Sequence, residues 1–366
     1  MEQTLSTLSA KRIIIFRALF LGDLLCATPA FRALRSRFPE AEIALIGLSW
    51  AQDFVDRLPS LDRLVLSPGF ASLPEVSYDP ERTQAFLADR RSEEYDLAIQ
   101  LHGSGRTTNA IVAALGARFS IGFGTADDPW VTATVPWVEE ENEILRCLRL
   151  VELVGADISD TALELPISQE ELTCGGQLLA PFGSPTTPIV VLHAGAKDPR
   201  RRWPVERFAQ LGDELVRRFD ARIVLTGGPE DQPLAAGIQR LMRGPSLDLT
   251  GKTDLGVFAA VLAHADLLVS NDTGASHLAV ATRTPSVVLF GFARPERWGP
   301  LDRSLHTVID AVTFDGRQAD PATALLALPL EPVLELCVRK LEAERPPSQA
   351  GQASAPVLVS PGGGAR

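Results

Sequence analysis

Short apolar segments alternate with helix-like segments along most of this chain, and that alternation limits the fold more than any other feature of the sequence. The segments expected as strands are residues 12–16, 43–48, 62–67, 96–103 and 118–124, followed by a second series at 189–195, 222–228, 247–251, 266–272 and 286–291. Strands that alternate with helices form parallel, doubly wound sheets. We therefore predict an α/β protein built from Rossmann-like sheets.

The two series of strands predict two domains. A chain of 366 residues is long for one domain, and a Pro/Gly/Ser/Thr-rich segment at 180–188 separates the two series. We expect Rossmann-like domains over 1–180 and 189–330, then a C-terminal helix over 331–344. Residues 345–366 are rich in Pro, Ser, Gly and Ala with almost no charge, which predicts a disordered tail.

The edge of each sheet at the carboxyl ends of its strands is where ligands of open α/β folds bind. We therefore expect the active site in a central cleft where the two domains face each other. The helix after the first strand starts at this edge. Pro29 either occupies the first turn of that helix, with Thr28 as its cap, or kinks a helix that begins at Asp23.

Composition excludes several classes of protein. The formal net charge is −11, whereas a general nucleic-acid binder normally carries a basic excess. The four cysteines lie far apart and predict reduced thiols in a cytoplasmic protein. Charged residues interrupt the apolar N-terminal segment, which argues against a signal peptide. No run approaches the ~20 apolar residues that would span a bilayer, so we expect a soluble protein.

The segment 271–277, Asn-Asp-Thr-Gly-Ala-Ser-His, follows an apolar strand and opens a helix. Asp272 or Thr273 can cap that helix, and Gly274 lets a ligand approach the backbone. The free N–H groups and the positive helix end can then bind a diphosphate, to which His277 can donate. Ordinary helix capping with a buried, hydrogen-bonded histidine is the alternative.

A basic cluster follows the strand at 189–195. Lys197, Arg200, Arg201 and Arg202 place four cations within six residues at the carboxyl end of a parallel strand, which suits a dianionic leaving group. A solvated run of charges is the alternative interpretation.

The segment from Arg17 to Asp23 leaves the first strand and lacks the GxGxxG pattern of a dinucleotide site. Gly22 gives the turn its freedom, and Asp23 puts a carboxylate at the top of the sheet. That carboxylate can act as a general base or simply cap the next helix. The chain also contains no Asp-x-Asp pair to hold a divalent cation, so we expect no metal and no cofactor.

Several of these segments together resemble glycosyltransferase family 9, the ADP-heptose:lipopolysaccharide heptosyltransferases, over roughly residues 12–342. The most specific are IIIFRALFLGDLLCATPAFRALRSRFPEAEI, RRWPVERFAQLGDEL, VLTGGPED and LLVSNDTGASHLAVATRTPSVVLFG with RWGP after it. The resemblance implies a GT-B fold with an acceptor-side N-terminal domain and a nucleotide-sugar-binding C-terminal domain. It also implies inversion at the anomeric carbon without a metal.

The resemblance also implies roles for individual residues. Asp23 occupies the place of the proposed catalytic base, and Arg201 the cationic position two residues before the Trp-Pro. Glu230 matches a glutamate that contacts the donor sugar or ribose, although without the family it reads as an exposed turn residue. The donor phosphates and sugar are assigned to a motif matched here by Asp272, Thr273, Gly274 and His277.

This chain departs from the family at two places. Phe20 stands where similar enzymes mostly have a small residue, and residues 193–196 lack the hydroxyls that some members place near the phosphates. These departures concern the identity of the donor and leave the reaction class intact.

The expected partners are a nucleotide-diphosphate sugar and a lipid-linked glycan, with peripheral contact at the inner face of the cytoplasmic membrane. The alternatives are a related transferase with another nucleotide sugar or a protein acceptor, a GT-B-type epimerase, and a non-catalytic nucleotide-sugar-binding protein. A dinucleotide-dependent oxidoreductase is disfavoured by the missing GxGxxG.

Overall fold

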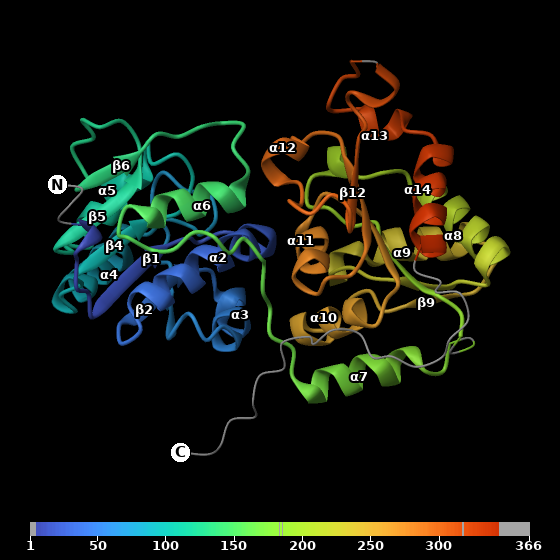
Figure 1. Ribbon diagram of the computed structural model, residues 1–366, viewed down its shortest axis with the longest axis horizontal. Helices are drawn as coiled ribbons and strands as arrows, with labels where there is room; N and C mark the ends of the chain where they lie inside the picture. The colour runs from blue at the N-terminus through green and yellow to red at the C-terminus, as the bar shows by residue number, and fades with distance from the viewer. Residues whose placement is uncertain (1–4, 183, 185, 317, 344–366) are drawn as a thin grey trace. The chain divides into compact units, whose positions relative to one another are not determined.

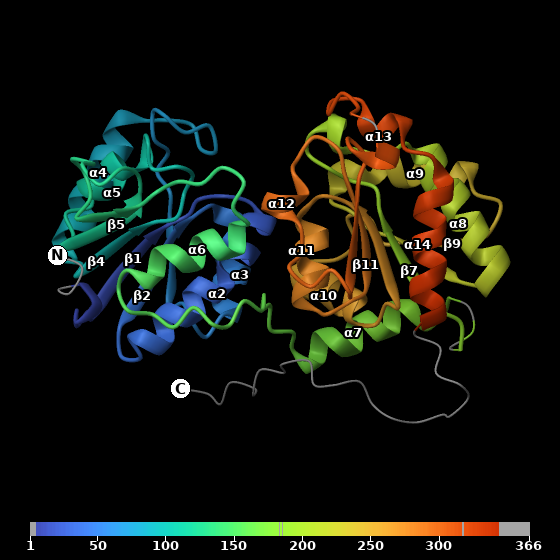
Figure 2. The ribbon, with the colours of Figure 1, turned by 45° about the horizontal axis from the view of Figure 1, so that its top comes forward.

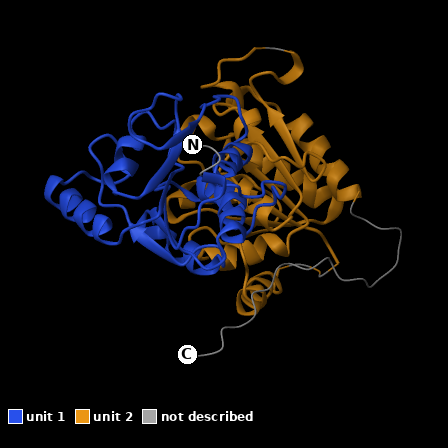
Figure 3. Ribbon diagram, turned by 60° about the vertical axis from the view of Figure 1, so that its left-hand side comes forward, with its two compact units in different colours: residues 1–164 blue, residues 165–366 orange. Residues whose placement is uncertain are grey.

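The chain folds into two compact units, residues 1–164 and 165–366 (Figure 3). The computed structural model describes residues 5–182, 184, 186–316 and 318–343. The tail expected over 345–366 lies outside these residues.

The first unit is built on a parallel sheet of six strands in the order β3-β2-β1-β4-β5-β6 (Figure 1). The strands are β1 (Arg12–Phe16), β2 (Glu42–Gly47), β3 (Arg63–Leu66), β4 (Leu97–Gln100), β5 (Phe119–Phe123) and β6 (Ala133–Val135). The helices are α2 (Leu21–Arg37), the 3-10 turn η1 (Ser49–Ala51), α3 (Gln52–Arg57), α4 (Pro80–Ser92), α5 (Thr108–Ala114) and α6 (Glu143–Glu152). This strand order is that of dinucleotide-binding Rossmann sheets.

The interior of the first unit is formed where apolar strand residues meet helices on each face. Ile14 in β1 pairs in parallel register with Ala44 and Ala98, and the three are buried in one cluster with Val112 of α5. On the other face α2 packs against α6. Strands that are apolar on both faces need a helical layer on each, because either face would otherwise expose apolar surface to water.

Helix α2 resolves the two alternatives for Pro29. The helix begins at Leu21, two residues before Asp23, and Pro29 lies inside it. Proline cannot donate to the carbonyl four residues earlier. The Thr28 hydroxyl donates to that carbonyl, on Leu25, at 2.8 Å, so the helix continues through the proline.

The second unit repeats the architecture with the strand order β12-β11-β10-β7-β8-β9. Its strands are β7 (Ile189–His193), β8 (Arg222–Leu225), β9 (Ser246–Asp248), β10 (Leu267–Asn271), β11 (Ser286–Phe290) and β12 (His306–Asp310). Its helices are α7 (Gln169–Leu179), η2 (Pro199–Arg201), α8 (Val205–Phe219), η3 (Pro229–Asp231), α9 (Gln232–Leu241), α10 (Leu255–Ala263), α11 (Gly274–Ala281), α12 (Pro295–Trp298), η4 (Phe314–Gly316), α13 (Ala324–Ala327) and α14 (Leu330–Ala343). Helices α8, α9 and α14 cover one face and α10 and α11 the other (Figure 2).

Helix α7 was not among the predicted elements. It belongs to the second unit and packs against α10, where Gly175 lies close to Ala260. The segment 180–188, expected to link the domains, therefore lies between α7 and β7 within the second unit, and the units divide between Glu164 and Leu165. The missed signal was a capping box, in which Ser168 and Glu171 bond each other's backbone N–H groups.

None of the helices in the described part of the chain combines the length and the apolar character required to traverse a lipid bilayer.

Candidate functional site

All the predicted site residues except Glu230 follow the strands at which the order of each sheet reverses. In the first unit β1 pairs with β4, so the loops that leave these two strands diverge at the carboxyl edge of the sheet. In the second unit β7 and β10 are the corresponding pair. Such reversals open a crevice between diverging loops, and this is where doubly wound sheets bind ligands.

Asp23 lies in the first turn of α2, immediately after the loop that leaves β1. Its carboxylate accepts from the Phe20 N–H at 3.3 Å, so it does cap the helix, and the side chain stays partly exposed. Burial of the carboxyl raises the pKa of Asp23, and Glu143 raises it further, while Arg17 and the N–H groups lower it. A base with a raised pKa is better matched to neutral pH than an ordinary aspartate. Gly22 occupies the preceding position of the same turn.

Arg17 is buried, with 1% of its surface exposed. Its Nε donates to the backbone carbonyl of Asp23 at 2.8 Å, and its Nη1 donates to the carbonyl of Leu101 in the loop after β4. Its Nη2 forms an ion pair with Glu143 of α6 at 3.1 Å. One guanidinium therefore ties together the loops of both strands at the reversal point.

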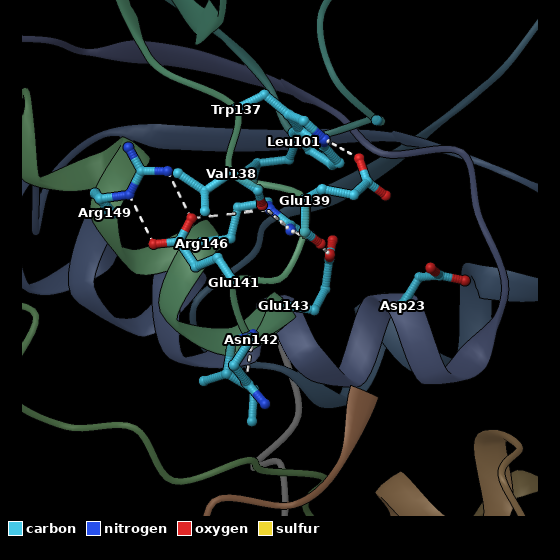
Figure 4. Close-up of polar contacts among 12 residues, drawn as sticks. Asp23, Leu101, Trp137, Val138, Glu139, Glu141, Asn142, Glu143, Arg146 and Arg149 are labelled. Carbon is cyan, nitrogen blue, oxygen red and sulfur yellow. Dashed lines mark hydrogen bonds and ion pairs between the residues drawn. The ribbon is translucent and has the colours of Figure 1, made fainter. Parts of the chain in front are cut away.

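Glu143 was not among the predicted site residues. It is buried in the first turn of α6, where it also pairs with Arg146. Figure 4 shows Glu143 and Arg146 on α6, with Asp23 on the adjacent α2. An acidic residue in the first turn of a helix reads as ordinary helix stabilisation. Because 126 positions separate Glu143 from Arg17, no local pattern could reveal the contact.

In the second unit the structure brings Arg201 and Asp272 together. The Arg201 Nη2 donates to both the carbonyl and the carboxylate of Asp272, and the Arg201 side chain remains 32% exposed. The buried Asn271 side chain accepts from the Trp203 N–H at 3.0 Å and donates to the Ala194 carbonyl at 2.9 Å. These bonds fix the loop after β7 against the end of β10, and so hold Arg201 beside α11.

Thr273 stands at the N-cap position of α11, but its hydroxyl does not cap the helix. The Oγ1 atom is buried and bonds to no group in the described part of the chain. Gly274 is the first residue of α11, and His277, in its first turn, is buried with its ring edge-on to Trp298, the centroids 6.3 Å apart. A helix N-terminus with an uncommitted hydroxyl can bind an anion.

The other cations of the basic cluster are arranged differently. Arg200 pairs with Asp198 at 2.5 Å and lies over the Phe292 ring, 4.0 Å from its centroid. Arg202 donates to the Ala196 carbonyl at 2.8 Å, and Lys197 is exposed. Among the described contacts of these arginines, those of Arg201 reach Asp272, so the cluster is not one undivided run of solvated charge.

Glu230 is exposed in η3, after β8, with its carboxylate folded back over Gly228. The neighbouring Asp231 is buried, and its carboxylate accepts from the Gly228 N–H at 3.1 Å. A Cβ at Gly195 would lie 2.2 Å from that carboxylate, so the loop after β7 requires glycine there. Asp231 thus packs the loops of β7 and β8 together, while Glu230 remains accessible to a ligand.

A family model described as glycosyltransferase family 9 (heptosyltransferase) matches residues 85–314. The chain belongs to this family. The family 9 chain is therefore a glycosyltransferase, as the sequence motifs predicted.

The relatives to which this chain is similar are also heptosyltransferases. The family 9 chain is 23% identical over 304 residues to lipooligosaccharide heptosyltransferase 2 of Haemophilus influenzae, spanning 79% of this chain and 86% of the relative. It is 24% identical over 313 residues to lipopolysaccharide heptosyltransferase 2 of Salmonella typhimurium, spanning 81% and 87%.

Solved structures of similar proteins confirm the GT-B fold of the family 9 chain. A family 9 glycosyltransferase from Veillonella parvula superimposes with a TM-score of 0.76 at 22% identity, covering 93% of this chain and 100% of that one. The ADP-heptose lipopolysaccharide heptosyltransferase II of E. coli gives a TM-score of 0.71 at 21% identity, with coverages of 92% and 100%.

Proposed function

We propose that this glycosyltransferase moves heptose from ADP-heptose to a lipopolysaccharide core or related glycan, with inversion and without a metal. The family and the named relatives support the sugar and the acceptor. The observation that carries the mechanism is the Asp23 carboxylate. It is partly exposed at the strand-order reversal, its pKa is raised, and it forms no ion pair with any described residue.

In the proposed reaction, the Asp23 carboxylate removes the proton from an acceptor hydroxyl. The hydroxyl oxygen forms the new bond to the anomeric carbon as the bond to the nucleoside diphosphate breaks, which inverts the configuration. The transition state resembles an oxocarbenium ion, as in glycoside hydrolysis. Diphosphate is already a good leaving group, so the proposal includes no general acid.

The departing diphosphate needs positive charge that is already in position. We assign this role to Arg201, the Thr273–Gly274 backbone and His277, supported by the exposed guanidinium beside the start of α11 and the unbonded Thr273 hydroxyl. Lys197 is a further candidate from the same loop, and Glu230 is assigned to the donor sugar or ribose. Asp272 orients Arg201 through their ion pair.

The acceptor side of the proposal rests on the loop after β4. Arg106 in this loop is exposed and forms no hydrogen bond or ion pair with any described group. Arg17 bonds the Leu101 carbonyl of the same loop and the Asp23 carbonyl. An accessible arginine there suits an anionic group on the acceptor. A lipid-bearing acceptor would be presented at a membrane, so we also propose peripheral contact with the cytoplasmic face.

The deciding experiment incubates the protein with a panel of nucleotide sugars and candidate acceptors and identifies products by mass spectrometry. We expect a heptose-bearing glycan, the β or α linkage opposite to that of the donor, and release of ADP that depends on acceptor. Release of nucleotide without acceptor would indicate an epimerase, and donor binding without turnover would indicate a binding protein. Transfer of another sugar, or transfer to protein, would identify a different member of the same reaction class.

A further inference from the structure

Arg17 is a buried cation in the same turn region as the proposed base, yet its guanidinium does not bond the base. Its three contacts are the carbonyl of Asp23, the carbonyl of Leu101 and the carboxylate of Glu143. The Asp23 carboxylate instead accepts from the Phe20 N–H. The arginine therefore faces the backbone of Asp23 and leaves its side chain without an ionic partner.

A buried arginine without a compensating charge would be expected to turn to the nearest available carboxylate. A positive charge within about 4–6 Å of an aspartate stabilises its ionised form and weakens it as a base. Glu143 supplies the compensation, because its carboxylate forms the buried ion pair with Arg17 at 3.1 Å. The pair has side-chain exposures of 1% and 6%, so water screens it little.

Glu143 also forms an ion pair with a second buried arginine, Arg146. Arg146 lies over the Trp137 ring 3.9 Å from its centroid and donates to the Val138 carbonyl at 2.5 Å. Figure 4 shows these contacts around the start of α6. Because Arg146 has no exposed surface, Glu143 has a fixed position between two arginines.

We propose that Glu143 is a positioning residue for the reaction, which holds the Arg17 guanidinium against backbone carbonyls and offsets its charge so that the Asp23 carboxylate stays out of an ion pair. This inference rests on the proposed role of Asp23 as the base. It assigns to Glu143 no contact with substrate.

The other titratable groups that face Asp23 are uncharged near neutral pH. They are the thiols of Cys26 on α2 and Cys147 on α6. Burial raises the pKa of Cys147 to about 12 and that of Cys26 well above its usual value. His102, which lies near Arg17, has its pKa lowered to about 4 by burial. Arg17 and Glu143 are therefore the charged groups that set the field at Asp23.

The test is the pH dependence of kcat/KM in Glu143→Gln. Ionised Asp23 is the active form, so activity falls as pH drops through its pKa. Loss of the Glu143 charge leaves Arg17 uncompensated, which should lower that pKa and move the acid limb down by about one pH unit. The plateau kcat should fall about threefold, because a base weakened by about one pKa unit transfers the proton less readily. Donor affinity, measured by calorimetry, should not change.

Glu141→Gln is the matched control. Glu141 lies just before α6, pairs with Arg149 at 2.5 Å and with Arg146 at 3.9 Å, and forms no ion pair with Arg17. Its acid limb should coincide with that of the wild type. A Glu143→Gln enzyme with an unmoved acid limb would overturn the inference and leave Glu143 as a stabilising residue only.

Removal of one member of a buried ion pair can prevent folding. A second test therefore compares an Arg17 variant with the double variant that lacks both charges. Arg17→Met should move the acid limb to higher pH, and adding Glu143→Gln to it should move the limb back toward the wild-type position. Identical limbs in the single and double variants would contradict the inference. Failure of the proposed function gives a different result, because Asp23→Asn would then retain wild-type turnover.

Discussion

The two strand-order reversals share a topology but differ in how they hold charge. At the β1–β4 reversal the charges of Arg17, Glu143 and Arg146 are buried and paired with one another. At the β7–β10 reversal the main cation, Arg201, is about one-third exposed, and the Thr273 hydroxyl bonds no described group. The buried charges of the first unit fix the electrostatic potential around Asp23. In the second unit the Arg201 guanidinium and the Thr273 hydroxyl remain available as hydrogen-bond donors.

This difference corresponds to two chemical tasks. A general base needs a carboxylate whose pKa is set by its surroundings and whose oxygens can reach a substrate. A diphosphate site needs donors that can give up solvent or a weak internal partner when the anion arrives. The same sheet topology can serve both tasks, because the loops at the reversal, and not the strands, carry the reactive groups.

The largest effect is expected from Asp23→Asn. This change removes the proposed base and keeps the shape, so turnover should fall at least about 100-fold while donor affinity stays nearly intact. Single-turnover rates with saturating acceptor, together with calorimetry, measure the two quantities.

Asp79→Asn is the control for Asp23→Asn. Asp79 also caps a helix of the first unit, accepting from the Arg82 N–H at 3.0 Å. If Asp23 served only as a cap, the two variants would behave alike, with a small loss of stability and near wild-type turnover.

The next effect concerns Arg201→Ala. Negative charge on the diphosphate grows as the glycosidic bond breaks, so the contact should be stronger in the transition state than in the ground state. We expect kcat to fall roughly 10- to 100-fold and the affinity for free ADP to fall much less.

Arg200→Ala supplies the comparison, since Arg200 is the adjacent arginine but pairs with Asp198 and stacks on Phe292. Its kcat should stay near the wild-type value. If both variants had the same single-turnover rate as the wild type, Arg201 would have no part in the mechanism.

Thr273→Val should have smaller effects, which are opposite in sign for stability and for ADP binding. The substitution keeps the shape and removes a buried hydroxyl that bonds no described group, so the free enzyme should become more stable by about 1 kcal/mol. The affinity for ADP should fall roughly fivefold, because one hydrogen bond to phosphate is lost.

Urea unfolding measures the stability of the Thr273 variant, and calorimetry measures its affinity for ADP. Ser270→Ala is the control, because its hydroxyl is likewise buried without a partner among described groups but lies within β10. Equal ADP affinity in Thr273→Val and wild type would exclude the hydroxyl from the phosphate site.

Local sequence patterns predicted most of the secondary structure that positions these sites. The strand predicted over residues 12–16 is β1, and Asp272 and Arg201 each belong to motifs next to an apolar strand. Their contact with each other could be anticipated only because parallel strands share a carboxyl edge.

Features that depend on tertiary packing were not predicted. Helix α7 was missed because its Gly175-Gly176 pair weakens the helical signal, which packing on α10 overcomes. For Pro29 the sequence left two alternatives, and the structure supports the one with the proline inside the helix, where Thr28 bonds the carbonyl that proline leaves open. Glu143 was missed because its partner Arg17 is remote in sequence.

The smallest effect is expected from removal of divalent cations. In the proposed mechanism the charge that a metal would supply comes from Arg201 and the start of α11, so turnover in excess EDTA should equal turnover without it. The sequence has no Asp-x-Asp pair, and within residues 5–182, 184, 186–316 and 318–343 no group of three His, Cys, Asp or Glu side chains could hold a metal ion. Loss of activity in EDTA that magnesium or manganese restored would transfer the electrostatic role from Arg201 to a cation bound with the diphosphate. The same titration in Arg201→Ala separates the two cases, because a cation that replaces the guanidinium should rescue that variant selectively.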